Sequence, residues 1–201
     1  MIDARLQPLQ QMVLRPPAAV LAARGVSADA ISLAGFGVGL LAVPALALGW
    51  WMAAFVLIAA NRIMDGLDGA VARINGPTDR GAFLDIALDF VFYALVPVGF
   101  ALADPAANAL PGAVLIAAFV GTGSSFLAYA AIAAKRGDQP ARMPAKGIHY
   151  LGGLTEGFET IVLFLAMCLF PGLFPVFALV FAAACGVTTA LRWHQGWTAF
   201  R

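Results

Sequence analysis

The stretch DGLDGAVAR at residues 65–73 is followed, after a short turn, by GAFLDIALD at residues 81–89. This stretch carries Asp65, Asp68, Asp85 and Asp89 within apolar segments, where a lone Asp costs about 2.5–3.5 kcal/mol at mid-membrane. Asp65 and Asp68 share one helix face at i, i+3, and Asp85 and Asp89 share another at i, i+4. Because the intervening turn makes the two helices antiparallel neighbours, we expect both pairs to face each other at one depth.

Such a group of acids needs a positive partner, because the carboxylates repel one another and lose their hydration. Hard oxygen ligands without His or Cys suit Mg²⁺ or Mn²⁺. Two ions about 3.5–4 Å apart are a common device for phosphoryl displacement. We therefore predict that two divalent ions are bound by four ligands, namely Asp65, Asp68, Asp85 and Asp89.

The composition of the whole chain indicates a membrane protein. Of the 201 residues, 62% are hydrophobic and 11% are charged, against roughly 25% charged in an ordinary soluble domain. These figures exclude a soluble globular protein and a nucleic-acid binder. Because a span needs about 20 residues, the chain has room for about six, and we predict an all-α integral membrane protein with six transmembrane helices.

The chain divides into two regions. Residues 1–25 are expected to form an N-terminal interfacial helix, because three arginines lie among apolar residues, and the three prolines of this segment should interrupt it. Residues 26–201 form the catalytic domain, with a helix turn expected near Gly49 because the uncharged segment 30–60 is too long for one span. The predicted spans are about 29–48, 51–72, 81–103, 112–134, 152–170 and 174–191.

The basic residues predict the orientation. With six spans, all twelve Lys and Arg fall on the side of the N-terminus, and the opposite loops 49–51, 104–111 and 171–174 hold none. By the positive-inside rule both termini are cytoplasmic. The acids then open to the cytoplasmic side of a multi-pass protein, which we expect in a bacterial inner membrane.

The acidic stretch resembles the signature of the CDP-alcohol phosphotransferase family, D-x-x-D-G-x-x-A-R, a loop, then G-x-x-x-D-x-x-x-D. All eight fixed positions of that signature are present here. The resemblance implies six membrane helices, a homodimer, and transfer of a substituted phosphate from a CDP-alcohol to an acceptor hydroxyl with release of CMP. We expect CDP-diacylglycerol (CDP-DAG) as the donor, since its acyl chains can stay in the membrane, and a small alcohol as the acceptor.

The resemblance also implies residue roles. Asp89 would serve as the base that deprotonates the acceptor, in addition to contacting metal. The cytidine diphosphate site would include Asp65, Gly69 and Ala72, while Arg73 either holds a phosphate or pairs with an acid. Asp29 and Ser32 stand where relatives carry residues near the nucleotide, although helix capping explains Asp29 equally well. The predicted donor-site residues are therefore Asp65, Gly69, Ala72, Arg73, Asp29 and Ser32.

The acceptor is less well determined. Lys135, Arg136 and Arg142 follow the fourth predicted span, where they either bind a phosphorylated acceptor or anionic lipid headgroups, or are ordinary cytoplasmic charges. Glu156 and Glu159 open the fifth predicted span and either bind a cationic or polyol acceptor or pair with nearby bases. Relatives that use glycerol phosphate or inositol phosphate often show Tyr-x-Lys/Arg-Ala-Arg late in span four. This chain has YAAIA at residues 129–133, which argues against those acceptors.

A different class of function also fits an acidic cluster in a membrane protein. A divalent-cation transporter or channel would use the four Asp as its ion site. Such a site should lie near the midplane with a polar route to the far side, whereas these acids lie at one end of their helices. A catalytically inactive relative is a third interpretation, which the presence of all four Asp disfavours.

Overall fold

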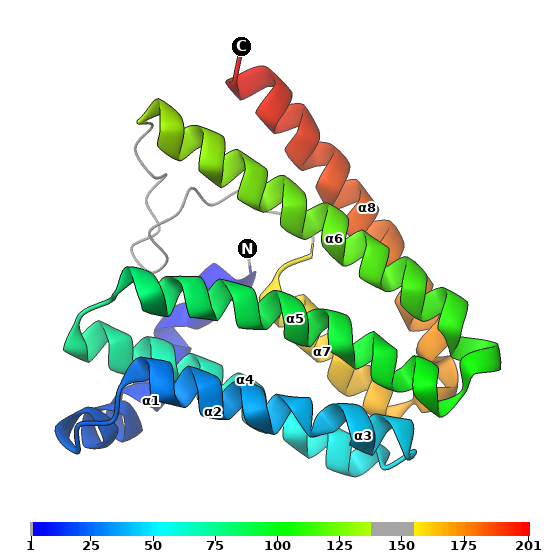
Figure 1. The fold of residues 1–201 in the computed structure, drawn as a ribbon, viewed down its shortest axis with the longest axis horizontal. Helices are drawn as coiled ribbons and strands as arrows, with labels where there is room; N and C mark the ends of the chain where they lie inside the picture. Colours follow the sequence, from blue (N-terminus) through cyan, green and yellow to red (C-terminus); the bar gives the residue numbers. More distant parts are fainter. Residues whose placement is uncertain (1, 138–154) are drawn as a thin grey trace.

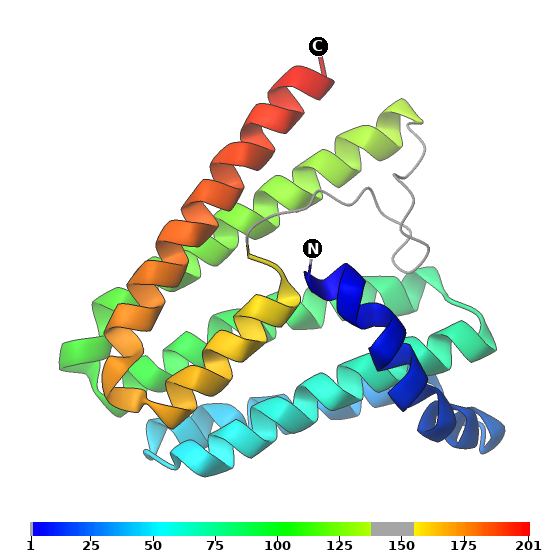
Figure 2. The same ribbon diagram turned by 180° about the vertical axis from the view of Figure 1, so that it is seen from behind.

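The computed structural model describes residues 2–137 and 155–201, and this part of the chain is helical without any strand. Figure 1 shows α2 packed between α4 and α5, with α6 and α8 side by side and at an angle to α5. Figure 2 shows the other side, where α7 and α1 lie against α4. The helices are α1 (Ile2–Ala23), α2 (Ala28–Leu40), α3 (Ala42–Ala47), α4 (Trp51–Asn75), α5 (Asp79–Ala103), α6 (Pro105–Arg136), α7 (Gly157–Leu169) and α8 (Phe174–Ala199), with a 3₁₀ turn at Pro171–Leu173.

Helix α1 is continuous, so the prediction that its prolines interrupt it was wrong. Pro16 and Pro17 remove the donors that would serve the carbonyls of Met12 and Val13. Both of these residues are exposed, so their carbonyls can find other partners. Buried Ala18 anchors the helix in a small apolar cluster with α2 and α4.

The first predicted span is broken in the middle. Helix α2 ends at Leu40 and α3 begins at Ala42, with the Leu41 N–H turned to the carbonyls of Val38 and Gly39. Pro44 lacks the N–H that would serve the Leu40 carbonyl, which accounts for a break here. The expected turn near Gly49 is confirmed: Gly49 has a φ of +72°, a left-handed conformation that glycine adopts readily. Helix α4 then starts at Trp51.

In the described part of the chain, four helical segments are long and apolar enough to cross a membrane. They are Ala28–Ala47, Asp79–Ala103, Pro105–Arg136 and Pro171–Ala199. Helix α4 is long enough, but its second half carries the motif's charges, and α7 has only 13 residues. Each predicted span thus contains helix within the described residues, while length and composition mark four segments as candidate crossings and the predicted count was six.

An aromatic core holds the bundle together at the end away from the acids. Trp51 stacks on Phe100 with ring centroids 5.6 Å apart, and Phe100 stacks on Phe174 at 4.6 Å. Phe92, Phe164 and other buried residues of α3 to α8 continue this core. Helix α2 packs against both α4 and α5, so it fixes the two helices that carry the acids.

Candidate active site

Three of the four motif acids come together between α4 and α5. Asp65 and Asp68 on α4 and Asp85 on α5 each offer a carboxylate oxygen, and these oxygens lie within 4.8 Å of one another. Asp89 lines the same cavity, one helical turn further along α5. The sequence prediction that the two acidic faces meet is confirmed.

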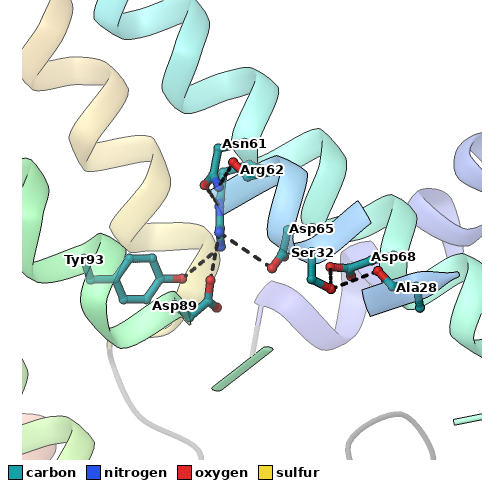
Figure 3. Close-up of polar contacts among 9 residues, drawn as sticks. Ala28, Ser32, Asn61, Arg62, Asp65, Asp68, Asp89 and Tyr93 are labelled. Carbon is teal, nitrogen blue, oxygen red and sulfur yellow. Dashed lines mark hydrogen bonds and ion pairs between the residues drawn. The ribbon is translucent and has the colours of Figure 1, made fainter. Parts of the chain in front are cut away.

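Asp68 is held in place by a contact with α2. It is only 6% exposed, and the Ser32 Oγ on α2 lies 2.5 Å from its Oδ2. The same hydroxyl lies 3.1 Å from the Ala28 carbonyl (Figure 3). Ser32 was predicted as a donor-site residue. In the structure it contacts Asp68 and fixes the position of that carboxylate.

Asp89 is paired with Arg62, which in the sequence is only one of the twelve basic residues used to predict the orientation. Arg62 lies inside α4, and its Nη2 is 2.8 Å from Asp89 Oδ1 and 3.6 Å from Asp65 Oδ1 (Figure 3). Arg62 was not predicted from the sequence to join the acid cluster. Its i, i+3 spacing from Asp65 puts both on one helix face, and this spacing was the signal that could have identified it.

The acids fit a divalent cation. The cluster offers three carboxylate oxygens in mutual reach, and among the described residues that line the cavity there is no His or Cys. Hard oxygen donors without nitrogen or sulfur are typical of Mg²⁺ and Mn²⁺ sites. The residues present therefore fit the metal that the motif implies.

One side of α4 next to Asp68 is open. A Cβ added at Gly69 would meet the Arg73 Nη1 at 3.5 Å, and no other heavy atom of the described residues would lie near it. Ala72 is half-buried on the same helix, and Arg73 is exposed. The three residues thus form a small-residue surface with a guanidinium above it, beside the acids.

Asp29 has a partner in the structure. Its Oδ2 accepts a hydrogen bond of 2.7 Å from the Nε of Arg80. A Cβ at Gly81 would lie 3.3 Å from Asp29 Oδ1, so Asp29 sits against the start of α5. Helix α2 is capped instead by Ser27, whose Oγ accepts from the Ala30 N–H. Capping therefore does not account for Asp29.

The basic acceptor candidates lie at the far end of α6. Lys135 and Arg136 are exposed in its last turn. Arg136 donates to the Ala199 carbonyl at 3.2 Å and lies over the Phe200 ring, so it ties α6 to the end of α8. Neither residue is among those lining the acid cavity. Arg142 lies outside the described residues.

The two acidic acceptor candidates start α7. Glu156 is the N-cap of α7 and Glu159 its third residue, and the two form a capping box. The Glu159 side chain accepts from the Glu156 N–H at 3.2 Å. Neither is among the residues that line the acid cavity, so helix capping gives both acids a structural partner and their acceptor role stays a prediction.

The chain is similar to known proteins over most of its length. The family model of CDP-alcohol phosphatidyltransferase matches residues 26–192. The inner membrane protein YnjF of Escherichia coli (strain K12) is 52% identical over 201 residues, which cover 100% of this chain and 98% of that protein. An archaetidylinositol phosphate synthase of Methanothermobacter thermautotrophicus is 34% identical over 140 residues, or 69% of this chain and 64% of that protein.

Solved structures share the fold. Mycobacterium tuberculosis phosphatidylinositol phosphate synthase with CDP-DAG bound has a TM-score of 0.68 and 24% identity, over 93% of this chain and 94% of that chain. The same enzyme in complex with manganese and citrate has a TM-score of 0.67 and 22% identity, over 92% and 89% of the two chains.

Together with its apolar helices, the relationship to an inner membrane protein identifies this chain as a bacterial integral membrane protein. The match of a family model to most of its length settles the reaction class. The chain belongs to the CDP-alcohol phosphatidyltransferase family and is a transferase of substituted phosphate groups in phospholipid biosynthesis.

Proposed function

We propose that this protein transfers the phosphatidyl group of CDP-DAG to the hydroxyl of a small alcohol and releases CMP. The observation that carries the proposal is the meeting of Asp65, Asp68 and Asp85 from two different helices. The related fold that binds CDP-DAG supports this lipid as the donor. The transporter alternative is not favoured, since the chain belongs to a transferase family.

In this proposal the acids bind metal and the small residues beside them admit the donor. Asp65, Asp68 and Asp85 hold Mg²⁺ or Mn²⁺, and Asp89 is the fourth ligand of a two-ion site. Bound metal supplies Lewis-acid activation of the diphosphate and stabilises charge on the departing CMP. The small surface of Gly69 and Ala72 lets the nucleotide approach the backbone. The proposed donor site comprises Asp65, Gly69, Ala72, Arg73, Asp29 and Ser32.

Asp89 is proposed as the general base. Its Oδ1 is engaged by Arg62, so Oδ2 is the oxygen that would both contact metal and take the proton of the acceptor hydroxyl. A carboxylate base must lie within hydrogen-bond reach of that hydroxyl, and holding both reactants side by side supplies much of the remaining rate enhancement. The acceptor itself is proposed to meet the loop and helix ends that carry Lys135, Arg136, Arg142, Glu156 and Glu159.

The proposed setting is a homodimer in the inner membrane, with six spans per chain, both termini cytoplasmic and the acids open to the cytoplasmic side. Residues 1–25 lie at the interface and residues 26–201 form the catalytic domain. The absence of basic residues from the connections near residues 49–51, 104–111 and 171–174 supports this orientation.

The test is release of CMP. Purified protein in detergent is incubated with CDP-DAG, Mg²⁺ or Mn²⁺ and a panel of small alcohols, and the lipid product is identified by mass spectrometry. We expect CMP and a new phospholipid with one class of acceptor, and no product when the metal is chelated. Folded protein that releases no CMP with any acceptor would contradict the proposal.

A further inference from the structure

Arg62 is a cation inside the acid cluster that lies outside the eight motif positions. Its side chain is 16% exposed, and it lines the same cavity as all four acids. A buried guanidinium is always charged. The cluster therefore contains a permanent positive charge before any metal binds.

The guanidinium is fixed by the protein on every side. Its Nε donates to Asn61 Oδ1 at 2.9 Å, its Nη1 lies 3.4 Å from the Tyr93 hydroxyl, and its Nη2 contacts Asp89. Its carbon Cζ lies 5.3 Å from the Phe92 ring centroid and 5.6 Å from that of Tyr93. With partners for all three nitrogens and aromatic rings beside it, Arg62 is positioned to stay in place when other groups enter.

Asn61, which orients Arg62, is itself tightly held. It is 3% exposed, and its Nδ2 donates to the Gly35 carbonyl at 2.9 Å. A Cβ at Gly39 would lie 2.9 Å from the same nitrogen, so a neighbouring glycine of α2 makes room for the amide. The position of the guanidinium is thus set by the packing of α2 against α4.

The charge makes the two ends of the cluster unequal. Asp65, Asp68 and Asp85 form a group that can hold an ion, whereas one oxygen of Asp89 is already taken by Arg62. With one divalent ion the four acids and Arg62 retain a negative formal charge, and a second ion would make the total positive. A second ion beside a guanidinium in a partly buried site is opposed by Coulomb repulsion unless an anion enters with it.

We propose that Arg62 makes binding of the second divalent ion, at the Asp89 end, depend on the diphosphate of the substrate. This inference rests on the proposed function, in which the donor is a nucleoside diphosphate lipid and the site takes two ions. The first ion binds to the three-carboxylate group without substrate. The second enters with the diphosphate, whose negative charge offsets the guanidinium.

The experiment measures Mn²⁺ binding by electron paramagnetic resonance and calorimetry, with and without CDP-DAG, and with inorganic pyrophosphate as a simpler diphosphate. We expect wild-type protein to bind one Mn²⁺ per chain alone and a second when CDP-DAG is present. Arg62→Gln should bind the second Mn²⁺ without any diphosphate, at least about tenfold more tightly than wild type. Arg62→Lys, which keeps the charge, should behave like wild type.

Arg24→Gln is the matched control, because Arg24 is exposed in the turn after α1 and should leave Mn²⁺ binding unchanged. Retained binding of the first ion shows that a variant's site is folded. The number of Mn²⁺ ions bound by wild-type protein is measured without any variant. Two ions bound with equal affinity in the absence of diphosphate would overturn the proposal. So would an Arg62→Gln protein whose second ion still requires diphosphate. The Arg62→Gln measurement uses no donor, so it can succeed even if no alcohol yields CMP.

Discussion

The Ser32 hydroxyl on α2 lies 2.5 Å from the Asp68 carboxylate on α4, which links a helix that carries none of the four motif acids to the proposed metal site. Asp68 is the most buried of the three clustered acids Asp65, Asp68 and Asp85. A buried ligand needs a partner that orients it. Ser32 therefore contributes to the site through Asp68.

We expect Ser32→Ala to weaken Mn²⁺ binding about 10–100-fold, the usual effect of losing a group that orients a metal ligand. Calorimetric titration of Mn²⁺ measures it. Ser124→Ala is the matched control, because Ser124 is exposed on α6 and its hydroxyl donates to the Gly121 carbonyl at 3.3 Å, away from the acids. An unchanged Mn²⁺ affinity in Ser32→Ala would show that Asp68 keeps its orientation without the hydroxyl.

Replacing Asp89 by Asn should lower the rate of CMP release at least about 100-fold, because an amide cannot take the acceptor proton. Binding of CDP-DAG should remain measurable, since Asp65 and Asp68 are intact. The control is Asp104→Asn, which keeps the cap of α6 because Asn caps a helix as well as Asp does. Turnover retained in Asp89→Asn would remove the assignment of the base.

Two glycines of α2 should respond differently to the same substitution. A Cβ at Gly35 would lie 2.9 Å from the Met64 Cβ, whereas one at Gly37 would meet nothing within 4 Å. Overpacking of this kind costs about 1–3 kcal/mol, so Gly35→Ala should lower the midpoint of thermal unfolding in detergent. Gly37→Ala should not. Equal midpoints for the two variants would contradict the close approach of α2 and α4.

The Asp29–Arg80 pair separates a nucleotide role from a structural one. The Arg80 side chain is 78% exposed, and exposed ion pairs are worth about 0–1 kcal/mol, so Arg80→Gln should change the free energy of unfolding by less than about 1 kcal/mol. If Asp29 lies near the nucleotide as proposed, Asp29→Ala should raise the KM for CDP-DAG and Arg80→Gln should not. Steady-state kinetics on both variants compares them, and equal KM values would leave Asp29 as a partner of Arg80 alone.

The meeting of the acids was predictable because it follows from helix periodicity and one short turn. Asp65 and Asp68 must share a face, as must Asp85 and Asp89, and antiparallel helices bring the faces together at one depth. The helices themselves were equally predictable, because apolar segments of this length form helices in a membrane. Even the turn at Gly49 was visible from the length of the uncharged segment.

Other features depend on contacts that periodicity does not contain. The role of Arg62 was missed because the basic residues were used only to predict topology. In a sequence, an arginine in a loop cannot be told from one in a buried ion pair. The prolines of α1 were judged by their backbone cost, while the buried contacts of Ala18 were not foreseeable. The capping box of Glu156 and Glu159 has Glu where the sequence signature has Ser or Thr at the N-cap, so the sequence did not indicate it, and acidic residues near a membrane suggested a binding role first.

The charged side chains in the second half of α4 affect how the protein is inserted into the membrane. Under the proposed six-span topology, the segment Trp51–Asn75 that enters the bilayer contains Arg62, Asp65 and Asp68. Each of these residues disfavours insertion of α4 as a solitary helix. The Arg62–Asp65 pair forms within α4, whereas the contacts of Asp68 with Ser32 and of Asn61 with Gly35 can offset the penalty only once α2 is already in place. Membrane insertion of this transferase is therefore expected to be sequential. We expect α2 and α3 to stay at the translocon until α4 packs against them and the helices enter the membrane as a hairpin.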